Sequence, residues 1–82
     1  MQGKRVTLTE NDLSLSPCEY GKNPVNDIWY CVTPNGHYGN LAGHDVIEHE
    51  DGTITVFPSI LVSDDTGELW HGFLEHGIWR VA

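Results

Sequence analysis

The sequence predicts an all-β fold, a small antiparallel sandwich or partly open barrel of about six short strands. Two observations carry this prediction. Apolar and polar residues alternate over short runs, which is the pattern of half-buried strands. Nine glycines and four prolines leave no uninterrupted segment long enough for a helical bundle. Because 82 residues suffice for one domain, we expect a single β domain over residues 1–82, with residues 1–27 as a less regular N-terminal arm and residues 28–82 as the β core.

The strongest strand signals lie in the middle of the chain. Residues 28–33 are rich in β-branched and aromatic side chains and end at a Pro-Asn-Gly turn. Residues 44–49 and 53–57 alternate on either side of an Asp-Gly pair, which predicts a hairpin. Pro58 has no amide hydrogen, so the strand ladder must break there.

The two ends of the chain differ in regularity. Near the N-terminus we expect a short edge strand at residues 6–9, a brief strand or irregular arm at 10–20 and a loop at 21–26. The C-terminal part should contain a strand at 59–63, a second hairpin arm at 68–75, a tight turn at His76-Gly77 and a closing strand at 78–81.

The charge distribution limits the classes of partner. The formal net charge is −8, and residues 23–79 contain no Lys or Arg. Direct binding to nucleic acid is not expected, because it requires cations that displace phosphate counterions. An acidic surface favours a basic protein partner instead. No apolar run is long enough to span a membrane and no secretory signal is visible, so we expect a cytoplasmic protein whose Cys18 and Cys31 are reduced thiols.

No motif of a known enzyme class is present, and the sequence favours a non-enzymatic role. The Gly-x-Ser-x-Gly elbow, the His-Glu-x-x-His zinc motif and the phosphate-binding loops are all missing. Aromatic residues are numerous, and neighbours such as Trp29 and Tyr30 must point to opposite faces of a strand. We therefore expect a protein-binding surface that combines acidic and aromatic residues, with these candidates: Glu48, Glu50, Asp51, Asp64, Asp65, Tyr30, Tyr38 and Trp79.

A zinc site is the main alternative. Zinc takes four N, S or O ligands, and the chain offers two cysteines and five histidines without a diagnostic spacing. The best set is Cys31, His37 and His71, which would meet if their strands are neighbours. The alternative function is then a small metal-binding domain.

Residues 54–80 carry a family resemblance. They contain Pro-Ser-Ile-Leu-Val at 58–62, Trp-His-Gly-Phe at 70–73 and Glu-His-Gly-Ile at 75–78. This stretch resembles a family of small bacteriophage and prophage proteins, some of which are labelled ammonia monooxygenases. The resemblance implies a β fold and a phage setting. Many members resemble metal-binding proteins, with a cysteine cluster upstream and a further cysteine shortly before the position of His71. This chain has only Cys31 upstream near the right place, and Glu68 and Leu69 stand where the second cysteine would be expected.

The preferred functional hypothesis is therefore an acidic, phage-type protein-binding module that inhibits or modulates a host protein. One version is mimicry of nucleic acid, which would block a basic groove. Besides the metal-binding domain, a further alternative is a structural or accessory virion protein that self-associates through an exposed edge strand.

Overall fold

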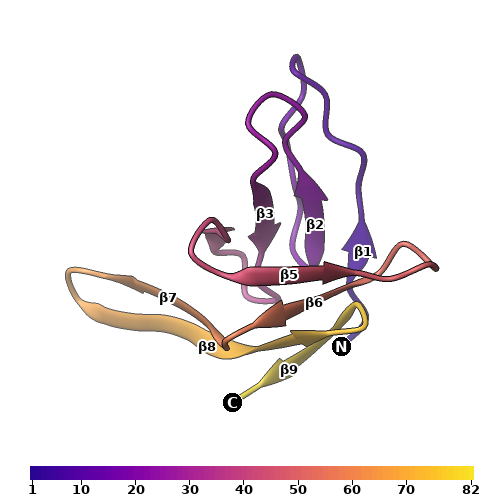
Figure 1. Ribbon diagram of the computed structural model, residues 1–82. Coiled ribbons are helices and arrows are strands. Elements are labelled where there is room, and N and C mark those ends of the chain that lie inside the picture. Colours follow the sequence, from indigo (N-terminus) through magenta and orange to yellow (C-terminus); the bar gives the residue numbers. More distant parts are fainter.

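Nine strands and no helix make up the computed structural model, which describes residues 1–82 (Figure 1). They form three small sheets with the orders β1-β2-β3-β4, β5-β6 and β7-β8-β9. All neighbouring strands are antiparallel except β1 and β2. In chain order the strands are β1 (Lys4–Arg5), β2 (Glu19–Lys22), β3 (Trp29–Val32), β4 (Tyr38–Asn40), β5 (Asp45–Glu48), β6 (Ile54–Phe57), β7 (Ile60–Asp64), β8 (Gly67–Glu75) and β9 (Ile78–Val81).

The all-β prediction is confirmed, with more strands than expected. The three sheets do not close into a barrel. The additional strands are very short: β1 has two residues and β4 has three. No helix has the length and hydropathy that a membrane span needs.

The predicted hairpins are present. Strands β5 and β6 pair with Val46 opposite Val56, around the turn that contains Asp51-Gly52. Strands β7 and β8 pair with Leu61 opposite His71, and the register shifts between Val62 and Ser63. The chain leaves the β5-β6 sheet at Pro58 and enters the next sheet at Ile60, as the missing amide hydrogen of proline predicts.

The N-terminal residues join two sheets. The Met1 ammonium donates to the Trp79 carbonyl oxygen at 2.8 Å, and the Trp79 amide donates to the Met1 carbonyl oxygen at 2.7 Å. Directly after this contact with β9, β1 pairs with β2. The predicted strand at residues 6–9 is wrong, because the ladder ends at Val6 and the chain then turns between Thr9 and Asp12.

The predicted loop at residues 21–26 begins later than expected. Gly21 belongs to β2 and lies opposite Tyr30. A Cβ at this position would lie 2.6 Å from the Val6 carbonyl oxygen, so the close approach of the two backbones requires glycine. Gly21, which suggested a loop, is therefore required by the packing of the backbones within the sheet.

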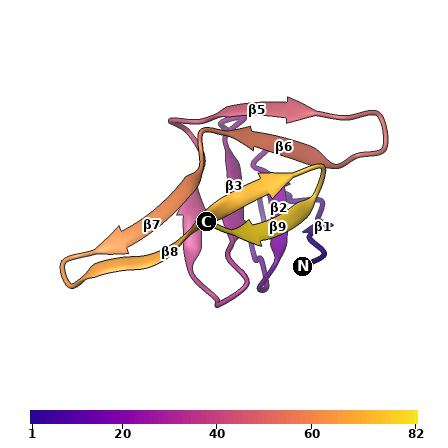
Figure 2. The ribbon, with the colours of Figure 1, turned by 90° about the horizontal axis from the view of Figure 1, so that it is seen from below.

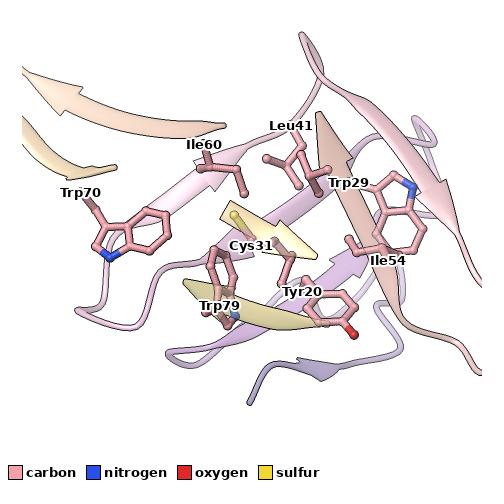
Figure 3. Close-up of a cluster of buried hydrophobic side chains, with 10 residues drawn as sticks. Tyr20, Trp29, Cys31, Leu41, Ile54, Ile60, Trp70 and Trp79 are labelled. Carbon is pink, nitrogen blue, oxygen red and sulfur yellow. The ribbon is translucent and has the colours of Figure 1, made fainter. Parts of the chain in front are cut away.

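The core lies where the sheets meet and is rich in aromatic side chains. Figure 3 shows Cys31 and Trp79 at its centre, with Trp70 and Trp29 toward its two ends. Trp70 and Trp79 pack edge to face, with ring centroids 5.4 Å apart. The members of this cluster are Tyr20, Trp29, Cys31, Leu41, Ile54, Val56, Ile60, Trp70, Leu74 and Trp79. One face of β8 supplies part of the core, and the other face of the strand points away from the core.

Candidate functional site

The outer face of the β7-β8-β9 sheet carries the side chains that alternate with the core. Along β8, Trp70 and Leu74 are buried, whereas His71, Phe73 and Glu75 point to the other side. The strand register adds neighbours from β7 and β9. Figure 2 shows β8 and β9 in front of β2 and β3, with no segment in front of them. We call this the outer face, and its side chains are Ser59, Leu61, His71, Phe73, Glu75, Ile78 and Arg80.

A hollow of about 320 Å³ opens on the outer face where β6 passes into β7. Phe57, Pro58 and Phe73 supply its apolar wall, and Ser59, Glu75 and Arg80 supply polar groups. The Arg80 guanidinium lies 4.8 Å from the centroid of the Phe73 ring and forms an ion pair with Glu75. The hollow thus places a fixed cation beside an apolar wall.

Next to the hollow, three polar side chains lie in a row. The Ser59 Oγ is 2.9 Å from the His71 Nε2. On the other side of the ring, the His71 Nδ1 is 3.8 Å from the Glu68 Oε1. The Ser59 carbonyl oxygen accepts a hydrogen bond of 3.2 Å from the His44 Nε2. Ser59 thereby makes two hydrogen bonds, one through its side chain to His71 and one through its backbone carbonyl to His44.

The acidic candidates fall into two groups rather than one surface. Asp51 and its neighbours lie at the β5-β6 turn, and Asp64 and Asp65 lie at the β7-β8 turn. Figures 1 and 2 place these two turns at opposite ends of the molecule. Glu48 in the first group is also paired with Arg5, at 2.8 Å. The second group lies at the turn of the β7-β8 hairpin, whose strands form part of the outer face.

Hydrogen bonds fix one carboxylate in each turn. The Thr66 hydroxyl and backbone amide both donate to Asp64 Oδ1, at 2.6 Å and 2.8 Å, and they lower the pKa of Asp64. Thr53 does the same for Asp51, at 2.6 Å and 3.0 Å, and lowers its pKa. Both groups therefore stay negatively charged at neutral pH.

Two histidine rings stack beside the β5-β6 turn. His49 and His76 have ring centroids 3.9 Å apart and planes only 8° from parallel. Thr55 lies beneath them, with its Oγ1 2.7 Å from the His49 Nε2 and 3.0 Å from the backbone amide of His76. This contact joins the β5-β6 hairpin to the β8-β9 turn and explains why the polar residue Thr55 is buried.

The aromatic candidates separate by exposure. Tyr38 is 52% exposed, and its ring lies 5.7 Å from that of the half-buried Tyr30. Trp79 is only 2% exposed, and its Nε1 donates to the Cys18 carbonyl oxygen at 2.9 Å. The expectation that Trp79 contributes to a binding surface is therefore wrong, because Trp79 lies on the side of β9 that packs into the core.

The predicted zinc ligands Cys31, His37 and His71 are not brought together. Cys31 is fully buried in β3 against Gly39, His37 lies in the β3-β4 turn, and His71 points to the outer face toward Ser59. No group of three or more His, Cys, Asp or Glu side chains is placed to hold a metal ion. The structure thus removes the residue set on which the metal-binding alternative depended.

We expect Cys31 to be unreactive in the folded protein, whereas Cys18 should react. Burial raises the pKa of the Cys31 thiol to about 12, and the thiolate is the reactive form. Cys18 is free and half-buried. Ellman's reagent should therefore modify one thiol in the native state and two in denaturant, and Cys18→Ser should abolish the native-state reaction. Rapid modification of Cys31 without unfolding would contradict its buried position.

Sequence reasoning named His71 only as a candidate zinc ligand and missed its surroundings. The alternation along β8 was visible and already separates His71 and Phe73 from Trp70. The facing residues on β7 and β9 depend on the strand register and on the break at Pro58, which bring Ser59 and Arg80 to the same surface. No local signal marks those two residues.

Comparison of the chain with protein-family models, curated protein sequences and solved structures found no match.

Proposed function

We propose that the chain is a protein-binding module that docks through its outer face onto a basic protein, a modulator of that protein rather than its substrate. The observation that carries the proposal is the exposed hollow beside an uncovered sheet face. Leu61 is 54% exposed and Phe57 is 48% exposed, so large apolar side chains meet water around it. Such groups on one face are typical of a protein interface.

The size of the hollow favours a side chain as its occupant. Pockets for small molecules usually enclose about 300–1,000 Å³, and this hollow, at about 320 Å³, is at the lower limit and open to solvent. A single large apolar side chain of a partner fits an opening of this kind, as anchors do at interface centres. We therefore expect the partner to present a protruding apolar residue.

The charge around the outer face selects a partner with positive charge. The β7-β8 hairpin, residues 60–75, carries Asp64, Asp65, Glu68 and Glu75 and no Lys or Arg. Arg80 is the one cation of the face and is already paired with Glu75. Acidic groups at the rim attract basic residues and speed association.

The resemblance to phage proteins supports a host protein as this partner. Nucleic-acid mimicry is not part of the proposal, because the acidic groups lie at opposite ends of the molecule.

The test compares variants of the outer face with matched variants elsewhere. Leu61→Ser changes the face, whereas Val25→Ser changes an apolar residue that is more exposed than Leu61 and lies in the loop between β2 and β3. Asp64→Asn with Asp65→Asn removes the charge beside the face, and Glu50→Gln removes charge at the opposite turn. Proteins captured by each variant from bacterial lysate are identified by mass spectrometry, and the binding of the purified partner is then measured.

The expected result is a basic protein that binds the wild type and both control variants. Leu61→Ser should weaken its affinity at least tenfold, and the double Asn variant should weaken it and reduce its salt dependence. The proposal fails if Leu61→Ser and Val25→Ser bind the captured protein equally, or if that protein is acidic. It also fails if sedimentation shows a dimer that Leu61→Ser dissociates, because the face would then serve self-association.

A further inference from the structure

We propose that Ser59 is a nucleophile activated by His71, and that the protein can transfer a small acyl group from an ester through an acyl-Ser59 intermediate. The distance from Ser59 Oγ to His71 Nε2, 2.9 Å, lies in the range in which a histidine accepts the proton of an attacking hydroxyl. This activity goes beyond protein binding, and it rests on the order of three side chains rather than on the surface as a whole.

The second ring nitrogen of His71 faces a carboxylate. Glu68 Oε1 lies 3.8 Å from His71 Nδ1, and the two residues lie three apart in β8. The order hydroxyl, imidazole, carboxylate is the one that serine hydrolases of unrelated folds share. Contacts of this type are often longer before substrate binds. Glu68 is a positioning residue here, since it acts on the ester only through the orientation of the imidazole.

The hollow provides space for the acyl group and a group that can stabilise negative charge. Ser59 and Arg80 line it together, so a carbonyl carbon near the Ser59 Oγ would have a guanidinium in the same hollow. A guanidinium has five N–H donors, more than the ion pair with Glu75 uses. The developing oxyanion can therefore receive hydrogen bonds from Arg80. At about 320 Å³, the hollow can hold an acyl group no larger than one large apolar side chain.

The reaction proceeds in two balanced halves. Ser59 Oγ bonds to the ester carbonyl carbon while its proton passes to His71 Nε2. The bond from that carbon to the alcohol oxygen then breaks, and the alcohol leaves with the proton from His71. Water attacks acyl-Ser59 in the same way and gives its proton to His71. Ser59 regains that proton, and the carboxylic acid is released.

The first test is covalent labelling of the wild-type chain, which does not depend on any variant folding. A fluorophosphonate is incubated with the native protein and with the protein in denaturant, and the modified residue is mapped by mass spectrometry. We expect one adduct, on Ser59, in the native protein alone. The absence of an adduct, or an adduct on another residue, would overturn the proposal.

The second test follows p-nitrophenyl acetate hydrolysis in variants whose folding is checked by circular dichroism. Ser59→Ala should abolish the burst of p-nitrophenol, and His71→Gln should slow acylation about 100-fold or more. Glu68→Gln should lower kcat with little change in KM, which a purely structural role would not produce. The matched controls Ser63→Ala, an exposed serine of β7, and His37→Gln should retain wild-type rates. Hydrolysis that persists in Ser59→Ala would assign the reaction to free histidine side chains and refute the proposal.

Discussion

Replacing Gly72 with alanine is expected to destabilise the protein by more than about 3 kcal/mol, at the upper end of what overpacking costs. Gly72 lies in β8 opposite Val81, with strands on both sides. A Cβ there would overlap the Arg80 carbonyl oxygen and the Trp70 ring, whose Cζ2 would be 2.8 Å away. Neither the Arg80 carbonyl group nor the Trp70 ring can move without a large cost in free energy. The carbonyl belongs to the β9 backbone, and Trp70 is part of the core cluster.

Gly43→Ala is the matched control for this prediction. Nothing lies within 4 Å of a Cβ at Gly43, and its backbone is outside the left-handed region. Its free energy of unfolding should change by less than about 0.5 kcal/mol. Urea unfolding followed by tryptophan fluorescence measures both variants. If Gly72→Ala unfolds at the same urea concentration as Gly43→Ala, the packing of Trp70 over Gly72 is not as described.

The parts of the fold that the sequence predicted are those determined by neighbouring residues. The β5-β6 hairpin follows from an Asp-Gly turn between two alternating runs, and the turn at His76-Gly77 has positive φ at both residues, 47° and 74°. The contact of Met1 with Trp79 joins residues 78 positions apart. No local pattern can reveal such a pairing, and the contact of the N-terminus with the edge of β9 was therefore not predicted.

The candidate site was harder to predict, because alternation separates two faces without saying which one is buried. In β9 both Ile78 and Trp79 are large and apolar, and packing on Tyr20 and Trp70 decides that Trp79 is inside. The row of Ser59, His71 and Glu68 depends on a register that a bulge shifts at Val62. The sequence suggested one surface for the acidic residues, and their division into two groups required knowing that the two hairpins extend in opposite directions.

The second large effect concerns Trp79. We expect Trp79→Ala to lower the free energy of unfolding by about 3–5 kcal/mol, as for other buried tryptophans. The Trp79 side chain packs edge to face on Trp70 and donates to the Cys18 carbonyl oxygen. The backbone carbonyl oxygen of Trp79 accepts a hydrogen bond from the Met1 ammonium. Removing the side chain leaves a cavity in the core and takes away one of the two hydrogen bonds that the Cys18 carbonyl oxygen accepts, the other coming from the Lys4 amide at 3.1 Å. Both effects lower the stability.

Two comparisons separate these contributions. Trp79→Phe keeps most of the apolar contact and loses the hydrogen bond to Cys18, so its loss of stability should be clearly smaller than that of Trp79→Ala. Tyr38→Ala removes an aromatic ring that is half exposed, and it should cost less than about 1 kcal/mol. Chemical unfolding followed by circular dichroism measures all three variants. Because an 82-residue domain is stabilised by only about 4–12 kcal/mol in total, Trp79→Ala should remove a large part of the stability and shift unfolding to a clearly lower denaturant concentration. If Trp79→Ala is as stable as Tyr38→Ala, then Trp79 lies at the surface and its buried position is wrong.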